Sequence, residues 1–250
     1  TAALLNLINI IESGSDLAGK EYLDLKALCE KVNLILIPCI NPDGRSHVPF
    51  DSFVGKTFND LRYYNQGTWL DGSLCGWPEC KRRHPIKDYV DYLGGYFNDD
   101  GVNLMHDDFF GEKASETKAL FDVCERYVPD FTVLLHGGTN CKNHILGPAY
   151  APLEIKQRVA DFEQLLKQNC ERGGLSLYTP NVNFDYGESR DLPVSFNLPS
   201  ALTHLCGEPC VTYESNQGLL DYPNGAGYDY DEIYRHHLIL FNTLIDFLIK

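Results

Sequence analysis

Three groups of polar residues follow short apolar segments, where catalytic side chains are often found. They are Asn41-Pro42-Asp43-Gly44, His136-Gly137-Gly138 and Glu214-Ser215-Asn216. A histidine followed by two glycines leaves room for an ion to approach the imidazole, as a metal ligand requires. A glutamate that closes a buried strand is costly without a partner. His136 is therefore a candidate metal ligand and Glu214 a candidate base; a hydrogen-bonded turn histidine and a structural ion pair or helix cap are the alternatives.

The elements that would position these residues alternate between helical and strand-like periodicity. Buried strands flanked by helices are typical of an α/β three-layer sandwich with a mainly parallel, mixed sheet and helices on both faces. In such sheets the carboxyl ends of the strands face the ligand crevice. The spacing of apolar residues, with turn and capping signals, predicts helices over about 2–13, 16–30, 115–127, 152–170, 199–206 and 230–250, and strands over 32–38, 131–135 and 209–214.

The chain of 250 residues has no linker-like segment, so one domain over 1–250 is expected. Residues 45–100 are rich in aromatic residues and interrupted by Gly and Pro, which indicates a long structured excursion within that domain. Trp69, Trp77 and the tyrosines of this excursion could line a specificity pocket or simply pack on the core.

Charge and hydropathy exclude two classes of partner. The net charge of -14 would repel a phosphate backbone, and the basic run Lys81-Arg82-Arg83 is too short for a nucleic-acid binding stripe. No apolar run approaches the roughly 20 residues needed to span a bilayer. We therefore expect neither a nucleic-acid nor a membrane partner.

The nine cysteines form no CxxC pair. An odd number of cysteines on apolar faces favours free thiols in a reducing, cytoplasmic compartment. Local disulfides between Cys75 and Cys80 and between Cys206 and Cys210 are the alternatives, and the localisation stays open. Any signal peptide would lie upstream of Thr1.

Five short motifs occur in a fixed order and together cover nearly the whole chain. They are Leu36-Ile37-Pro38 with Asn41-Pro42-Asp43-Gly44, Gly101-Val102-Asn103-Leu104, Ser115-Glu116-Thr117-Lys118-Ala119-Leu120, Leu134-Leu135-His136-Gly137 and Val211-Thr212-Tyr213-Glu214. In this order they resemble the zinc metallocarboxypeptidases. The resemblance implies the carboxypeptidase fold, one zinc ion, and a peptide substrate that is cleaved at its C-terminus. It also implies that His136 is the third zinc ligand and that Glu214 is the general base.

The chain departs from this family in two places. The family's other two zinc ligands come from an H-x-x-E motif that would lie before Thr1, and no His-x-x-Glu occurs in this sequence. We therefore expect an N-terminally truncated domain that binds zinc poorly. Met105 and His106 stand where the family has an Asn-Arg pair that grips the substrate carboxylate. His106 and the neighbouring Asn103 are candidate substrate-binding residues, but a histidine cannot replace a bidentate arginine.

The resemblance also implies a cation that stabilises the oxyanion and a tyrosine that assists the reaction. Lys56 and Arg62 are candidates for the cation, and a solvated surface charge is the alternative for each. Tyr186 and Arg190, in the segment before Glu214, are further candidates for contact with the substrate, and His144 is another candidate site residue.

Three functions remain open from the sequence. The first is a zinc-dependent hydrolase that removes C-terminal residues from peptides by metal-activated water. The second is an N-acyl amino acid amidohydrolase of the aspartoacylase or desuccinylase type, which the Met105-His106 change makes credible. The third is a non-catalytic binding protein on the same fold.

Overall fold

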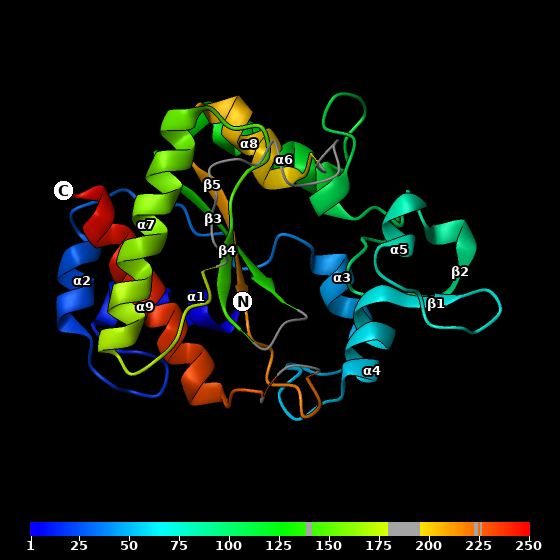
Figure 1. Cartoon of the computed structure of the whole chain (residues 1–250), viewed down its shortest axis with the longest axis horizontal. Coiled ribbons are helices and arrows are strands. Elements are labelled where there is room, and N and C mark those ends of the chain that lie inside the picture. Colours follow the sequence, from blue (N-terminus) through cyan, green and yellow to red (C-terminus); the bar gives the residue numbers. More distant parts are fainter. Residues whose placement is uncertain (139–141, 180–195, 223–224, 226) are drawn as a thin grey trace.

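The structure is a computed structural model of the chain, and it describes residues 1–138, 142–179, 196–222, 225 and 227–250. It is a mixed α/β fold (Figure 1). In chain order its elements are α1 (Ala2–Ser13), α2 (Leu23–Cys29), α3 (Pro42–His47), α4 (Phe58–Leu61), the π-helix η1 (Arg62–Gln66), β1 (Gly67–Trp69), α5 (Glu79–Arg82), the 3₁₀-helix η2 (Lys87–Tyr89), β2 (Val90–Leu93), the 3₁₀-helix η3 (Leu104–His106), α6 (Ser115–Tyr127), β3 (Thr132–Gly137), β4 (His144–Leu146), α7 (Leu153–Arg172), α8 (Leu198–Cys206), β5 (Cys210–Ser215) and α9 (Tyr230–Leu248).

Three strands form the sheet that carries the two candidate residues. The strand order is β3-β5-β4, with β3 parallel and β4 antiparallel to β5. Alternate residues of β5 enter different apolar clusters: Val211 and Tyr213 pack with α1, α2, α7 and α9, whereas Cys210 packs with α6 and α8. Helices thus lie on both faces of these strands (Figure 1). One of the two described pairings is antiparallel, so the expected predominance of parallel pairing is not seen within this sheet.

The helix expected over residues 16–30 begins only at Leu23. Asp16 Oδ1 accepts the backbone N–H groups of Ala18 at 3.0 Å and Lys20 at 2.9 Å, and these bonds hold a local turn. Short polar side chains that bond the neighbouring backbone compete in this way with helix formation. The prediction was therefore wrong for residues 16–22.

The strand expected over residues 32–38 is an extended segment that pairs with none of the described strands. Its side chains alternate between two faces, as in a strand. Leu34 and Leu36 pack against the apolar cluster that contains residues of α7 and α9, while Ile35 and Ile37 are exposed. After it, Asn41 Oδ1 accepts the N–H of Gly44 at 2.9 Å and caps the short helix α3. Asn41-Pro42-Asp43-Gly44 therefore begins a helix.

The excursion at 45–100 is well structured. It contains α4, α5 and the antiparallel pair β1 and β2, which lie together on the right of Figure 1. These elements enclose a small apolar cluster of Cys75, Cys80, Ile86, Val90 and Phe97. An apolar centre of its own lets this segment hold a fixed shape beside the main sheet.

None of the described helices combines the length and the apolar character needed to cross a membrane. All eight cysteines in the described part of the chain are free, including Cys75, Cys80, Cys206 and Cys210. Neither of the two disulfides considered from the sequence is therefore formed here. The ninth cysteine, Cys141, lies outside the described residues.

His236 is a fully buried residue of α9, and we expect it to make stability depend on pH. Its Nδ1 lies 3.5 Å from the Tyr213 hydroxyl and 3.9 Å from Cys170 Sγ, and its ring stacks on Tyr228. Burial, followed by the charges of His237 and Arg235, lowers the pKa of His236 from 6.5 to about 4.

The unfolded chain protonates the His236 imidazole at a higher pH than the folded chain does. The contribution of neutral His236 to the free energy of unfolding is therefore fully present above about pH 6.5 and is lost as pH falls toward 4. Between pH 7 and pH 5, His236 alone should remove about 2 kcal/mol from the free energy of unfolding. Urea unfolding of wild type and His236→Asn at both pH values measures this loss. The exposed His204→Asn serves as the control; an unchanged pH dependence in His236→Asn would contradict the assignment.

Candidate functional site

His136, Glu214 and His144 stand side by side across three strands. The sheet register pairs His136 of β3 with Glu214 of β5, and Glu214 with His144 of β4. His136 Nδ1 lies 3.9 Å from Glu214 Oε1, and His144 Nε2 lies 3.4 Å from Oε2. His136 and Glu214 are partly buried, and His144 is buried. One carboxylate is thus held between two imidazoles at the carboxyl ends of the parallel strands β3 and β5.

Backbone carbonyls orient both imidazoles. His136 Nδ1 lies 3.0 Å from the carbonyl oxygen of Gly137, and His144 Nδ1 lies 3.1 Å from that of Lys142. A carbonyl oxygen can only accept, so Nδ1 carries the proton in each ring. In His136 this leaves Nε2 as the nitrogen that could bind a metal, whereas His144 Nε2 faces Glu214 Oε2 at 3.4 Å.

Gly138 allows the turn after β3 to pass close to Glu214. A Cβ at this position would come 2.8 Å from Glu214 Oε2, closer than real Cβ atoms approach. The turn is held by the Gly138 N–H, which donates to Ser215 O at 2.9 Å, and by Gln217 Nε2, which donates to Gly138 O at 3.1 Å. A side chain at position 138 would therefore have to displace the Glu214 carboxylate, and glycine avoids this.

The excursion supplies an aromatic wall beside this row. The Tyr96 ring stacks on the His136 imidazole with centroids 6.0 Å apart, and Trp77 meets Tyr96 edge to face at 6.1 Å. Burial, followed by the charge of Glu214, raises the pKa of Tyr96 well above its usual value, so its phenol stays protonated and can donate. From the sequence, Tyr96 is one of the tyrosines of the excursion that could line a pocket, and its only individual signal is its place after Gly94-Gly95.

His106 extends this wall, whereas Asn103 is used internally. The His106 ring lies 5.6 Å from Trp77. Burial, followed by the charges of Lys81, His84 and His136, lowers the pKa of His106 from 6.5 to about 4, so the ring is neutral at neutral pH. Asn103 is buried: its side chain accepts the N–H of Met105 at 3.0 Å, and its own N–H donates to His84 Nε2 at 2.7 Å. Asn103 therefore shapes the loop that carries His106.

The two candidate oxyanion-stabilising cations lie in different surroundings. Arg62 lies with its guanidinium next to Gly76, the residue before Trp77. Lys56 is joined to the loop after β5 by a bond from the Leu220 N–H to its carbonyl, but its ammonium lies over the Phe50 ring at 4.8 Å. Tyr186 and Arg190 lie outside the described residues.

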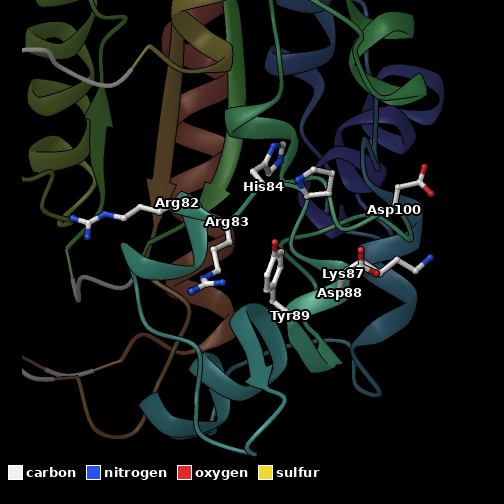
Figure 2. A pocket seen from close by; sticks show the side chains of 8 residues that line it. Arg82, Arg83, His84, Lys87, Asp88, Tyr89 and Asp100 are labelled. Atoms are coloured by element: carbon white, nitrogen blue, oxygen red, sulfur yellow. The ribbon is translucent and has the colours of Figure 1, made fainter.

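A hollow of about 540 Å³ opens on the surface of the excursion (Figure 2). Arg83, His84, Lys87, Tyr89 and Asp100 are among the residues that line it, and none of the row residues is. Figure 2 shows Arg82 reaching away from the other side chains and Arg83 lying beside the Tyr89 ring. This basic hollow is thus separate in its lining from the row and from the aromatic wall.

The described residues do not complete a zinc site. Hydrolytic zinc uses three protein ligands and one open position. No group of three or more His, Cys, Asp or Glu residues in the described ranges is arranged to hold a metal ion. In the row, the His136 nitrogen nearest to Glu214 is the protonated Nδ1, so the three side chains do not converge on one point.

Comparison with known proteins gives one structural likeness to report. No protein-family model matches the sequence, and no curated protein matches it either. A crystal structure of a metallo-carboxypeptidase from Burkholderia cenocepacia is similar to 77% of this chain, with a TM-score of 0.47 and 13% sequence identity. The match takes in 53% of that protein, so this chain spans about half of its length.

Proposed function

We propose that residues 1–250 belong to a zinc-dependent hydrolase domain, a three-layer α/β sandwich, that removes C-terminal residues from peptides. The observation that carries the proposal is the pairing of His136 with Glu214 at the carboxyl ends of two parallel strands. The motifs that contain these residues are the ones that resemble the zinc metallocarboxypeptidases. His136 is the proposed metal ligand and Glu214 the proposed general base.

Each residue of the row and the wall has a role that its surroundings support. Glu214 is partly buried between two imidazoles, a setting in which a carboxylate can accept the proton of an attacking water. Tyr96 offers a protonated phenol beside it. Arg62 is the proposed oxyanion-stabilising cation, because its guanidinium lies next to Gly76, which precedes Trp77 of the wall. Zinc would polarise the scissile carbonyl, but it needs two ligands more than the described residues provide.

An N-acyl amino acid amidohydrolase is the second candidate, and one observation favours it. His106 stands where the carboxypeptidase pattern has a carboxylate-binding arginine, and burial keeps this imidazole neutral at neutral pH. A neutral imidazole donates a single hydrogen bond and lacks the charge and fork of a guanidinium. Recognition of the substrate carboxylate must therefore use other residues than in that pattern.

Assays of the complete natural protein test the two hydrolase proposals. We expect release of the C-terminal residue from hippuryl-type peptides, loss of this activity with a zinc chelator, and its recovery when zinc is added. Cleavage of N-acyl amino acids alone would contradict the peptidase proposal and support the amidohydrolase. No hydrolysis of either class would contradict both proposals and favour a non-catalytic binding protein.

A further inference from the structure

One cation of the basic run Lys81-Arg82-Arg83 lies against the aromatic wall. Lys81 Nζ lies over the Trp77 ring at 5.3 Å, and its charge reaches His106 strongly enough to lower the pKa of that imidazole. Arg82 points away from the hollow in Figure 2, and Arg83 stacks at 4.8 Å on Tyr89. Of these three cations, Lys81 is the one that the structure brings to Trp77 and His106.

The surroundings of Lys81 combine a charge, an apolar surface and a hydrogen-bonding ring. The Trp77 side chain is 47% exposed and offers a flat apolar surface at the outer end of the wall that leads through Tyr96 to His136. His106, neutral and partly buried, lies 5.6 Å from Trp77 and can donate or accept one hydrogen bond. An organic carboxylate with a flat apolar body matches these three features, because its charge would meet the ammonium and its body the indole.

We propose that Lys81, Trp77 and His106 form a carboxylate-binding subsite beside the row of His136, Glu214 and His144. The subsite rests on the proposed function for its purpose, which is to hold the carboxylate of an N-acylated amino acid or peptide. In this subsite, residues of the excursion contribute to recognition of the substrate carboxylate together with His106. Lys81 supplies the charge that a neutral His106 lacks.

Binding of hippurate to this chain without zinc tests the subsite. Isothermal titration calorimetry should detect hippurate and should show binding of its neutral amide, hippuramide, that is weaker by roughly fivefold or more, because the amide lacks the charge that Lys81 meets. The indole N–H signal of Trp77 should shift on titration with hippurate in ¹⁵N NMR spectra. Trp69→Phe identifies that signal, since the chain has two tryptophans.

Four replacements at three lysines make the test specific. Lys81→Met should weaken hippurate binding roughly fivefold to tenfold, and Lys81→Arg should retain most of it. Lys113→Met is the matched control, because Lys113 is also half-buried and lies over an aromatic ring, Phe121, at the same 5.3 Å. Lys87→Met removes a cation from the basic hollow of Figure 2. Both control variants should bind hippurate like wild type.

Several outcomes would overturn the subsite: no hippurate binding by wild type, equal binding of hippuramide, unchanged binding by Lys81→Met, or loss of binding in Lys87→Met. These outcomes are separable from failure of the proposed function. If hippurate binding depends on Lys81 but the complete protein hydrolyses neither substrate class, the subsite is supported and the hydrolase proposal is contradicted. If the complete protein hydrolyses hippuryl peptides but Lys81→Met does not change hippurate binding, the hydrolase proposal is supported and the subsite is contradicted.

Discussion

Glu214→Gln is expected to lower kcat for peptide hydrolysis by the complete natural protein by roughly 10²–10⁴-fold, the usual contribution of a positioned general base. Glutamine keeps the size and hydrogen-bonding reach of the side chain but cannot take up a proton at neutral pH. The carboxylate is held by its strand neighbours His136 and His144 and by the close approach of Gly138. The fold should therefore survive the change, while proton transfer is lost.

The measurement is steady-state kinetics with a hippuryl peptide, together with circular dichroism to show that the variant is folded. Glu125→Gln is the control and should retain wild-type rates, because it makes the same carboxylate-to-amide change at an exposed position of α6. A rise in KM with unchanged kcat would show that Glu214 binds substrate without acting as the base. The base would then have to be sought elsewhere.

Phe162→Ala is expected to lower the free energy of unfolding by about 3–5 kcal/mol, whatever the chain's function. Phe162 is fully buried in α7, and its ring packs edge to face with Phe131 at 4.9 Å and against Phe247 at 5.6 Å. Truncation removes these contacts and leaves a cavity between α7, the start of β3 and α9. Such a loss is a large share of the stability of an ordinary domain.

Urea unfolding at pH 7.5 measures this effect, with Phe110→Ala as the control. Phe110 is 86% exposed, so its truncation should change stability by less than about 1 kcal/mol. Equal losses in the two variants would mean that Phe162 does not lie at the centre of the main apolar cluster. The pair of variants therefore tests the packing of α7 and α9 against the sheet.

The aromatic wall gives the excursion a role that connects its fold to the site. Two backbone hydrogen bonds hold Tyr96 next to His136: the Gly95 N–H donates to Tyr64 O, and the Tyr96 N–H donates to Asn65 O. The small cluster of Cys75, Cys80 and Phe97 anchors the loops on either side of the wall. Changes in the excursion should therefore alter ligand binding without touching His136 or Glu214.

The sequence by itself determined the longest helices and two of the strands of the sheet. Periodicity predicted the helices that became α6, α7, α8 and α9 and the strands that became β3 and β5, and the structure confirmed them within a few residues. It also placed His136 and Glu214 at strand ends. These features are encoded locally, because the spacing of apolar residues reports directly which face of a helix or strand is buried.

Only the tertiary structure decided which segments and side chains contact one another. The apolar segment 32–38 has the composition of a strand, but a strand also needs a hydrogen-bonding neighbour, and none of the described strands pairs with it. Likewise, the contacts of Glu214 with His144 and of His136 with Tyr96 join residues that are 70 and 40 positions apart in the chain. Sheet register and the path of the excursion create these contacts, and neither is encoded in the residues around any one of them.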